Sequence, residues 1–110
     1  MNVFTHRIDF GFGVELDCNK RPISPGDALT ALGQIGLAAN SLFGGYTLVE
    51  TVGSWVNPEG FTFSERGRTL TVYTDYRGTF AALGMAERIK RELNQEAVFI
   101  SVAQVNASIV

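Results

Sequence analysis

A strict alternation of side chains near the N-terminus limits the folds open to this chain. Seven positions would share one face of a strand: Phe4, His6, Ile8, Phe10, Phe12, Val14 and Leu16. The intervening positions are polar, charged or glycine. A period of two over about a dozen residues predicts a β-strand with one buried face, because successive strand side chains point to opposite faces. Gly11 and Gly13 are expected to bend or bulge its second half.

The rest of the chain predicts two helices and three further strands. Ser24 and Pro25 are typical of a helix start, and apolar spacing predicts that this helix continues to about Asn40. The other expected elements are strands at about 46–56 and 68–76, a helix from 77 to about 94, and a strand from 97 that extends as far as 110. Within the helices, Leu29 and Leu83 are expected to face the sheet. The segment 57–60 predicts a turn, and a break in alternation near 102–105 predicts a bulge.

The order β-α-β-β-α-β defines the expected fold class. Right-handed crossovers place both helices on one face of a four-stranded antiparallel sheet, which is the ferredoxin-like α+β arrangement. The length of 110 residues suits a single domain over residues 1–110. Two helices cover one sheet face, so the other face is expected to bind a subunit or a ligand. The residues expected there are Thr5, Arg7, Asp9, Thr71, Tyr73 and Ser101. An oligomer is therefore expected.

Composition argues against several classes of function. The net charge of −2 argues against nucleic-acid binding, which depends on clustered Lys and Arg. The single cysteine, Cys18, excludes a disulfide framework and a multi-cysteine metal site, and we expect it to be an inert thiol. No apolar run approaches 18 residues and no signal-peptide pattern is present, so we expect no membrane span and a cytoplasmic location.

The segment from Gly44 to Glu65 offers the lead toward a function, because it combines the only tryptophan with glycines, tyrosine and acids. The acids and aromatics of interest are Tyr46, Glu50, Trp55, Glu65, Tyr73 and Glu96. His6 lies on the apolar face of the first strand, so a structural role is expected, and no metal-ligand spacing is present. Acids and aromatics without a nucleophile suit a cationic ligand. An aromatic face attracts a cation by about 0.5–2 kcal/mol, and a carboxylate neutralises it.

From Gly45 onward the chain resembles the phage S-adenosylmethionine lyases and a related, uncharacterised bacterial domain family. The residues that carry the resemblance to the lyases are Tyr46, Glu50, Gly53-Ser54-Trp55, Glu65 and Gln95-Glu96. The chain departs from the lyases at Trp55, where they would have a tyrosine. The resemblance implies a ferredoxin-like trimer with active sites between subunits. It also implies cleavage of S-adenosylmethionine to methylthioadenosine and homoserine lactone, without a cofactor or metal.

The resemblance also implies roles for the matching residues. Glu65 would hold the substrate's ammonium group, Glu96 would be a second acid near the ribose or ammonium, and Tyr46, Glu50 and Trp55 would line the pocket. Two alternatives from other classes stay open. One is a non-enzymatic module, such as a phage or bacterial regulator, that binds a small molecule or a protein. The other is a structural oligomerisation domain. If the protein is phage-encoded, the expected location is the cytoplasm of the host bacterium.

Overall fold

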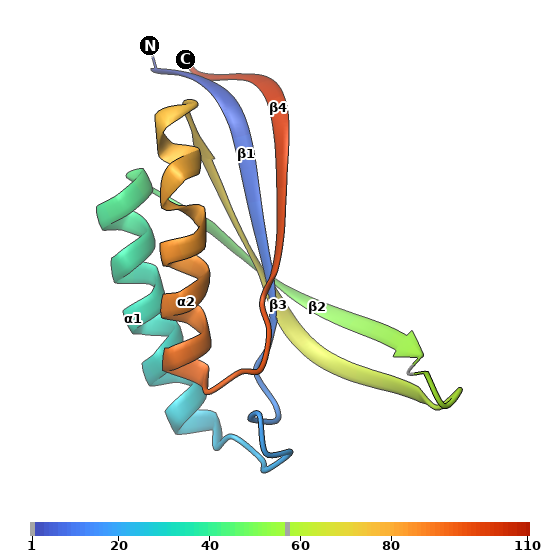
Figure 1. Ribbon diagram of the computed structural model, residues 1–110. Helices are drawn as coiled ribbons and strands as arrows, with labels where there is room; N and C mark the ends of the chain where they lie inside the picture. Colours follow the sequence, from blue (N-terminus) through green and yellow to red (C-terminus); the bar gives the residue numbers. More distant parts are fainter. Residues whose placement is uncertain (1, 57) are drawn as a thin grey trace.

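A computed structural model describes residues 2–56 and 58–110, with the side chains of Asn2, Trp55 and Phe63 outside the described part. The elements are β1 (Asn2–Gly13), α1 (Pro25–Phe43), β2 (Thr47–Val56), β3 (Thr62–Thr74), the 3-10 helix η1 (Arg77–Ala81), α2 (Ala82–Leu93) and β4 (Phe99–Ile109). The strands form one antiparallel sheet in the order β2-β3-β1-β4, and both helices cover one face (Figure 1). The predicted ferredoxin-like fold is confirmed.

The hydrophobic core lies between this sheet face and the helices. Its largest fully buried side chains are Ile8, Phe10, Ile35, Leu70, Val72, Met85 and Ile89. The alternation in β1 is confirmed, because Ile8, Phe10 and Phe12 are buried while the residues between them face the other side. The two central strands of the sheet therefore carry most of the apolar surface that the helices cover.

Local signals set the start of α1 correctly but its end too early. The Ser24 hydroxyl accepts a hydrogen bond from the Asp27 amide at 3.1 Å, as expected of an N-cap. At the other end Gly44 adopts a left-handed conformation (φ 80°), and its amide donates to the Asn40 carbonyl at 2.9 Å. This bond closes a last helical turn, so α1 continues to Phe43.

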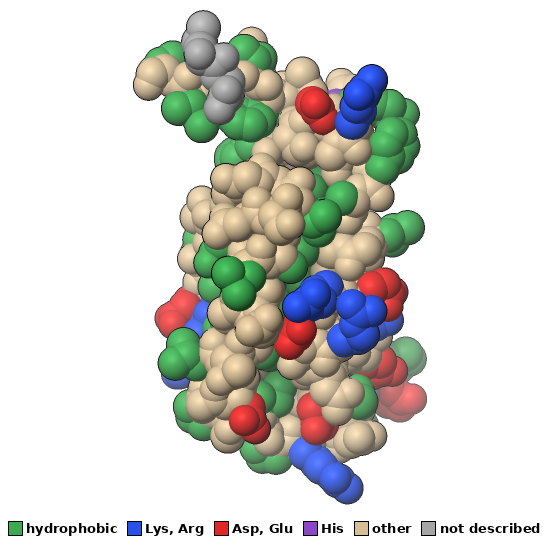
Figure 2. All heavy atoms as spheres, turned by 90° about the vertical axis from the view of Figure 1, so that its left-hand side faces the viewer, with side chains coloured by type: hydrophobic (Ala, Val, Ile, Leu, Met, Phe, Trp, Pro, Cys, Tyr) green, Lys and Arg blue, Asp and Glu red, His purple; other side chains and the backbone are tan. Residues whose placement is uncertain are grey.

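Two leucines expected to face the sheet do not. Leu29 and Leu83 are each 73% exposed, and Ala31 and Met85 are buried in the corresponding helices instead. The packing of the helices against each other and the sheet sets their rotation, and the buried face of α1 consists of Ala31, Ile35, Gly36 and Ala39. Exposed hydrophobic side chains therefore lie on the outer side of the helix layer (Figure 2). Among the described residues, no helix is long and apolar enough to cross a membrane.

The hairpin formed by β2 and β3 is longer than predicted. Strand β3 begins at Thr62 rather than near Arg68, because its pairing with β2 runs unbroken from Thr62 opposite Val56 to Thr71 opposite Thr47. Gly60 in the connecting turn has φ 87°, which fits the predicted turn, although Asn57 lies outside the described residues. The hairpin extends beyond the helices (Figure 1).

The sheet contains one irregularity, and it lies close to the predicted bulge. The pairing of β1 with β4 shifts between Phe4, opposite Ala107, and His6, opposite Gln104. Strand β4 thus holds an extra residue just past the predicted break at 102–105. Gly11 and Gly13 do not interrupt β1, whose pairing with β3 is continuous to Gly13.

The uncovered face of the sheet carries the polar residues predicted for it. Asp9 lies opposite Thr71 on one side and Ser101 on the other, and Arg7 lies opposite Tyr73. The Arg7 Nε–Asp9 Oδ2 distance is 3.1 Å, and the Thr71 hydroxyl donates to Asp9 Oδ1 at 2.5 Å. The Asp9 carboxylate therefore binds the side chains of both Arg7 and Thr71 in the middle of the open face.

Candidate functional site

A cavity of about 420 Å³ lies at the end of β1 nearest the loop that leads to α1. We call it the acidic cavity and define it by Glu65, Gln95, Glu96, Cys18 and Lys20, which all line it. Its floor is on the uncovered face of the sheet, because Gly13 has the opposite orientation to the buried Phe12. Two of the site residues predicted from sequence, Glu65 and Glu96, thus line one cavity within a single chain.

Glu65 reaches this cavity from within β3, not from a loop before it. It lies opposite Gly53 of β2, and its carboxylate crosses over Gly13 of β1. A methyl group at Gly13 would overlap both Glu65 Oε1 and the carboxylate carbon. The absence of a side chain at Gly13 is therefore what allows the carboxylate to lie against the sheet.

Gln95 presents an acceptor beside Glu65. Its amide nitrogen Nε2 donates to the carbonyl of Leu16 at 2.8 Å and to that of Leu93 at 3.1 Å. Both amide hydrogens are thereby used, so the oxygen Oε1 is left as the group that faces the cavity. This oxygen lies 3.2 Å from the position that a Cβ at Gly13 would take. Three carboxylates, those of Asp17, Glu65 and Glu96, and an amide oxygen therefore line the cavity, a set suited to an N–H-bearing cation.

The end of α2 positions Gln95 and Glu96. Asn94 ends the helix in a left-handed conformation (φ 49°), and the Gln95 amide donates to the Lys90 carbonyl at 2.9 Å. The loop after β1 is hydrogen-bonded to the C-terminal end of α2, because Cys18 N donates to the Asn94 carbonyl at 2.7 Å. The Cys18 thiol also donates to Asn94 Oδ1 at 3.4 Å. The wall of the cavity is thus held by hydrogen bonds between segments distant in sequence.

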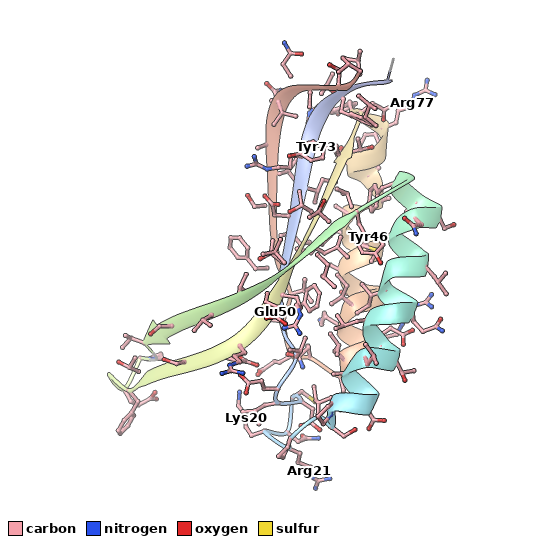
Figure 3. The ribbon with its side chains drawn as sticks, turned by 180° about the vertical axis from the view of Figure 1, so that it is seen from behind. Lys20, Arg21, Tyr46, Glu50, Tyr73 and Arg77 are labelled. Carbon is pink, nitrogen blue, oxygen red and sulfur yellow. The ribbon has the colours of Figure 1, made fainter. Side chains whose placement is uncertain are left out.

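Tyr46 lies far from the acidic cavity. Its hydroxyl packs on Gly36 of α1, where any Cβ would overlap it, and Figure 3 shows the ring between β2 and α1. Tyr46 also lines a second cavity of about 390 Å³, which we call the aromatic cavity and define by Phe4, Phe43, Tyr46 and Tyr73. Thr47, the neighbour of Tyr46, pairs with Thr71 of β3, and Glu65 lies six residues earlier in the same strand. Six residues of an extended strand span roughly 20 Å, so Glu65 lies about that far from the strand position beside Tyr46.

Glu50 lies on the opposite side of the sheet from Glu65. It is paired with Arg68, which lies opposite the buried Phe12, and its carboxylate is 3.3 Å from Arg68 Nη2. The Glu50 side chain is 84% exposed and lines a groove of about 920 Å³ between the hairpin and α1. Trp55 belongs to β2, but its side chain lies outside the described residues, so its assignment stays a prediction.

Sequence reasoning missed Lys20 and Gly13 as parts of this site. Lys20 lies in a loop whose path no periodicity indicates, and Gly13 was interpreted as a possible bend in the strand. The signal for Gly13 was its place on the uncovered face of β1, where a missing side chain leaves room for a neighbour. Gln95 was matched only through the resemblance to the lyases, and its hydrogen bonds depend on the folded positions of residues 16 and 93.

The fold and the acidic cavity together define a ferredoxin-like α+β protein with an acceptor-lined cavity on its open sheet face. No family model and no curated protein sequence matches the chain. Its backbone is similar to a phage SAM lyase solved in complex with S-methyl-5'-thioadenosine, with a TM-score of 0.63 and 12% identity over 94% of this chain and 90% of the lyase.

Two other solved structures show the same likeness. A phage SAM lyase in the apo state has a TM-score of 0.66 and 10% identity, covering 96% of this chain and 86% of the lyase. The periplasmic divalent cation tolerance protein CutA from Archaeoglobus fulgidus has a TM-score of 0.59 and 12% identity, covering 94% of this chain and 87% of CutA. At these identities the comparisons show a shared fold.

Proposed function

We propose that this protein binds S-adenosylmethionine and cleaves it to methylthioadenosine and homoserine lactone. The observation that carries the proposal is the acidic cavity, in which Glu65, Glu96 and the fixed Gln95 oxygen offer acceptors to one ligand. S-adenosylmethionine carries an ammonium group and a sulfonium, both of which favour such surroundings. The fold shared with phage SAM lyases supports the same choice.

The reaction makes few demands on the protein. A carboxylate oxygen of the substrate attacks its own γ-carbon, the bond between that carbon and sulfur breaks, and the electron pair stays on sulfur. The positive sulfonium becomes a neutral thioether, and no proton has to be transferred. Holding the substrate folded, with the reacting atoms close together, supplies the main rate enhancement. In this proposal Glu65 holds the ammonium group and Glu96 supports it or the ribose.

We further propose that the complete site forms between subunits of a homo-oligomer, with a trimer favoured. Glu65 and Thr71, the partner of Tyr46's neighbour Thr47, lie roughly 20 Å apart along β3 of one chain. Tyr46 and Glu65 line different cavities of one chain, so in this proposal Tyr46 contributes to the ligand from a neighbouring chain. Glu50 needs a neighbour too, because it lies on the other side of the sheet from Glu65. The uncovered sheet face and the long hairpin offer surface for such contacts.

The test is to incubate the purified protein with S-adenosylmethionine and measure methylthioadenosine by chromatography. We expect Glu65→Gln to reduce its formation about 100-fold, because a charge-assisted hydrogen bond of nearly 3 kcal/mol is lost. Glu87→Gln, the same change on the outer side of α2, is the control and should leave the rate unchanged. Product formation that does not exceed the spontaneous rate at high protein concentration would rule out lyase activity.

The main alternative is a non-enzymatic module that binds a small molecule. The likeness to CutA favours keeping this alternative, because the same fold also occurs in a divalent cation tolerance protein. Calorimetry with S-adenosylmethionine beside the product assay separates the two functions. Heat of binding without methylthioadenosine identifies a binding module, and the absence of both leaves a structural domain.

A further inference from the structure

Charges of both signs line the acidic cavity. Glu65, Glu96 and Asp17 supply negative charge, and of the described residues that line the cavity, Lys20 alone is positive. The ion pairs formed by the described residues involve other groups, so none joins Lys20 to any of these three acids within 4.0 Å. One cation and three acids thus line the same cavity, and none of the acids forms an ion pair with Lys20.

The loop that carries Lys20 has a defined conformation. Lys20 has a left-handed backbone (φ 62°), and its amide donates to the Asp17 carbonyl at 3.0 Å. The Asp17 carboxylate accepts from the amides of Asn19 at 2.8 Å and Arg21 at 3.0 Å. These bonds, with the Cys18–Asn94 contact at the end of α2, hold Lys20 at the rim of the cavity. Arg21 points away from the sheet at the end of the molecule (Figure 3).

We propose that Lys20 binds the carboxylate of the ligand, so that the cavity recognises the zwitterionic end of an α-amino acid. An α-amino acid carries an ammonium and a carboxylate on one carbon, and it therefore needs acceptors and a cation close together. Glu65, Gln95 and Glu96 provide the acceptors, and Lys20 provides the cation. The identity of the whole ligand as S-adenosylmethionine rests on the proposed function.

This role would also orient the reacting group. Lys20 would hold one oxygen of the substrate carboxylate, and the second oxygen would stay free to attack the γ-carbon. Lys20 is thus a substrate-binding residue whose loss should weaken binding more than it slows the bound substrate. Ligands that lack the carboxylate should be insensitive to Lys20.

The test compares three ligands: S-adenosylmethionine, its decarboxylated analogue S-adenosyl-3-methylthiopropylamine, and methylthioadenosine. We expect the wild-type protein to prefer S-adenosylmethionine over the decarboxylated analogue by about tenfold. In Lys20→Asn this preference should disappear, with binding of the other two ligands unchanged. Asn tolerates a left-handed backbone, so the loop should keep its conformation. Affinities come from KM and inhibition constants if the protein is active, and from calorimetry if it is not.

Arg21→Asn is the matched control, because it removes one positive charge from the same loop outside the cavity. It should leave the preference intact. If Lys20→Asn weakens both ammonium-bearing ligands equally, or if Arg21→Asn has the same effect, the inference is wrong. Binding of S-adenosylmethionine without cleavage would contradict only the proposed function. Cleavage with no preference for the carboxylate would contradict only the role of Lys20, and binding of none of the ligands would contradict both.

Discussion

A missing side chain at Gly13 determines where the Glu65 carboxylate can lie. We expect Gly13→Ala to displace this carboxylate, because the new methyl group would overlap it. Methylthioadenosine formation should fall at least tenfold, while the melting temperature changes little. The measurements are the product assay and a crystal structure of the variant.

Gly11→Ala is the control on the same strand and the same face. A Cβ there would meet Phe99 Cβ at 3.5 Å, an ordinary van der Waals contact, so the effect on activity should be far smaller. If the Glu65 carboxylate keeps its place in Gly13→Ala, the steric account of this position is wrong.

Single residues also show where sequence reasoning ends. The cap at Ser24 and the buried face of β1 follow from local patterns, and both are confirmed. The nearness of Glu65 and Glu96 depends instead on the sheet order, which places β1 between the strands that carry or follow them. Tyr46 and Glu65 were predicted to share one pocket from the resemblance to the lyases, which carries no information on how far apart the hairpin places them. A long hairpin separates such residues along the strand.

At the scale of elements, the interior of α1 and the residue that caps its C-terminal end should respond differently to the same substitution. Gly44 has a positive φ with open space around it, so Gly44→Ala should cost about 1–2 kcal/mol through backbone strain alone. The melting temperature should fall by several degrees in thermal unfolding followed by circular dichroism.

Gly33→Ala should have the opposite sign. Gly33 lies inside α1 with no atom near its Cβ position, so alanine should stabilise the helix by about 0.5–1 kcal/mol. Equal shifts in the same direction for the two variants would show that the helix does not end at Gly44 in solution.

Strand β3 shows why element boundaries are harder to predict than their order. Its first residues include Ser64, Glu65 and Gly67, which have low intrinsic preference for strands. They are in β3 because β2 provides a partner along the whole hairpin. Likewise the exposure of Leu29 and Leu83 follows from helix rotation, which is set by tertiary packing and not by spacing along the helix.

At the scale of the whole molecule, the proposed oligomer makes the hairpin an interface. Val52, 78% exposed, lies on β2 in this hairpin. We expect a mass measurement in solution to give a multiple of 12.0 kDa, with three chains favoured. Val52→Asp should shift the protein toward monomer and reduce lyase activity, because a charge would be buried in the contact.

Leu37→Asp is the control on the outer side of α1, where the side chain is also exposed. It should leave the mass unchanged. A wild-type monomer at micromolar concentration would contradict the shared site, and with it the participation of Tyr46 and Glu50.

The two hydrogen bonds donated by the Gln95 side-chain amide have a consequence for the energetics of binding. With both hydrogens already engaged by the carbonyls of Leu16 and Leu93, the amide cannot turn to offer a donor to an anion. Its dipole is oriented before any ligand arrives, so binding a cation requires no reorganisation of this group. The free energy that a flexible side chain would lose on becoming ordered was already spent when the chain folded. The Gln95 oxygen should thus favour a cationic group over an anionic one at this point of the acidic cavity even before a ligand binds.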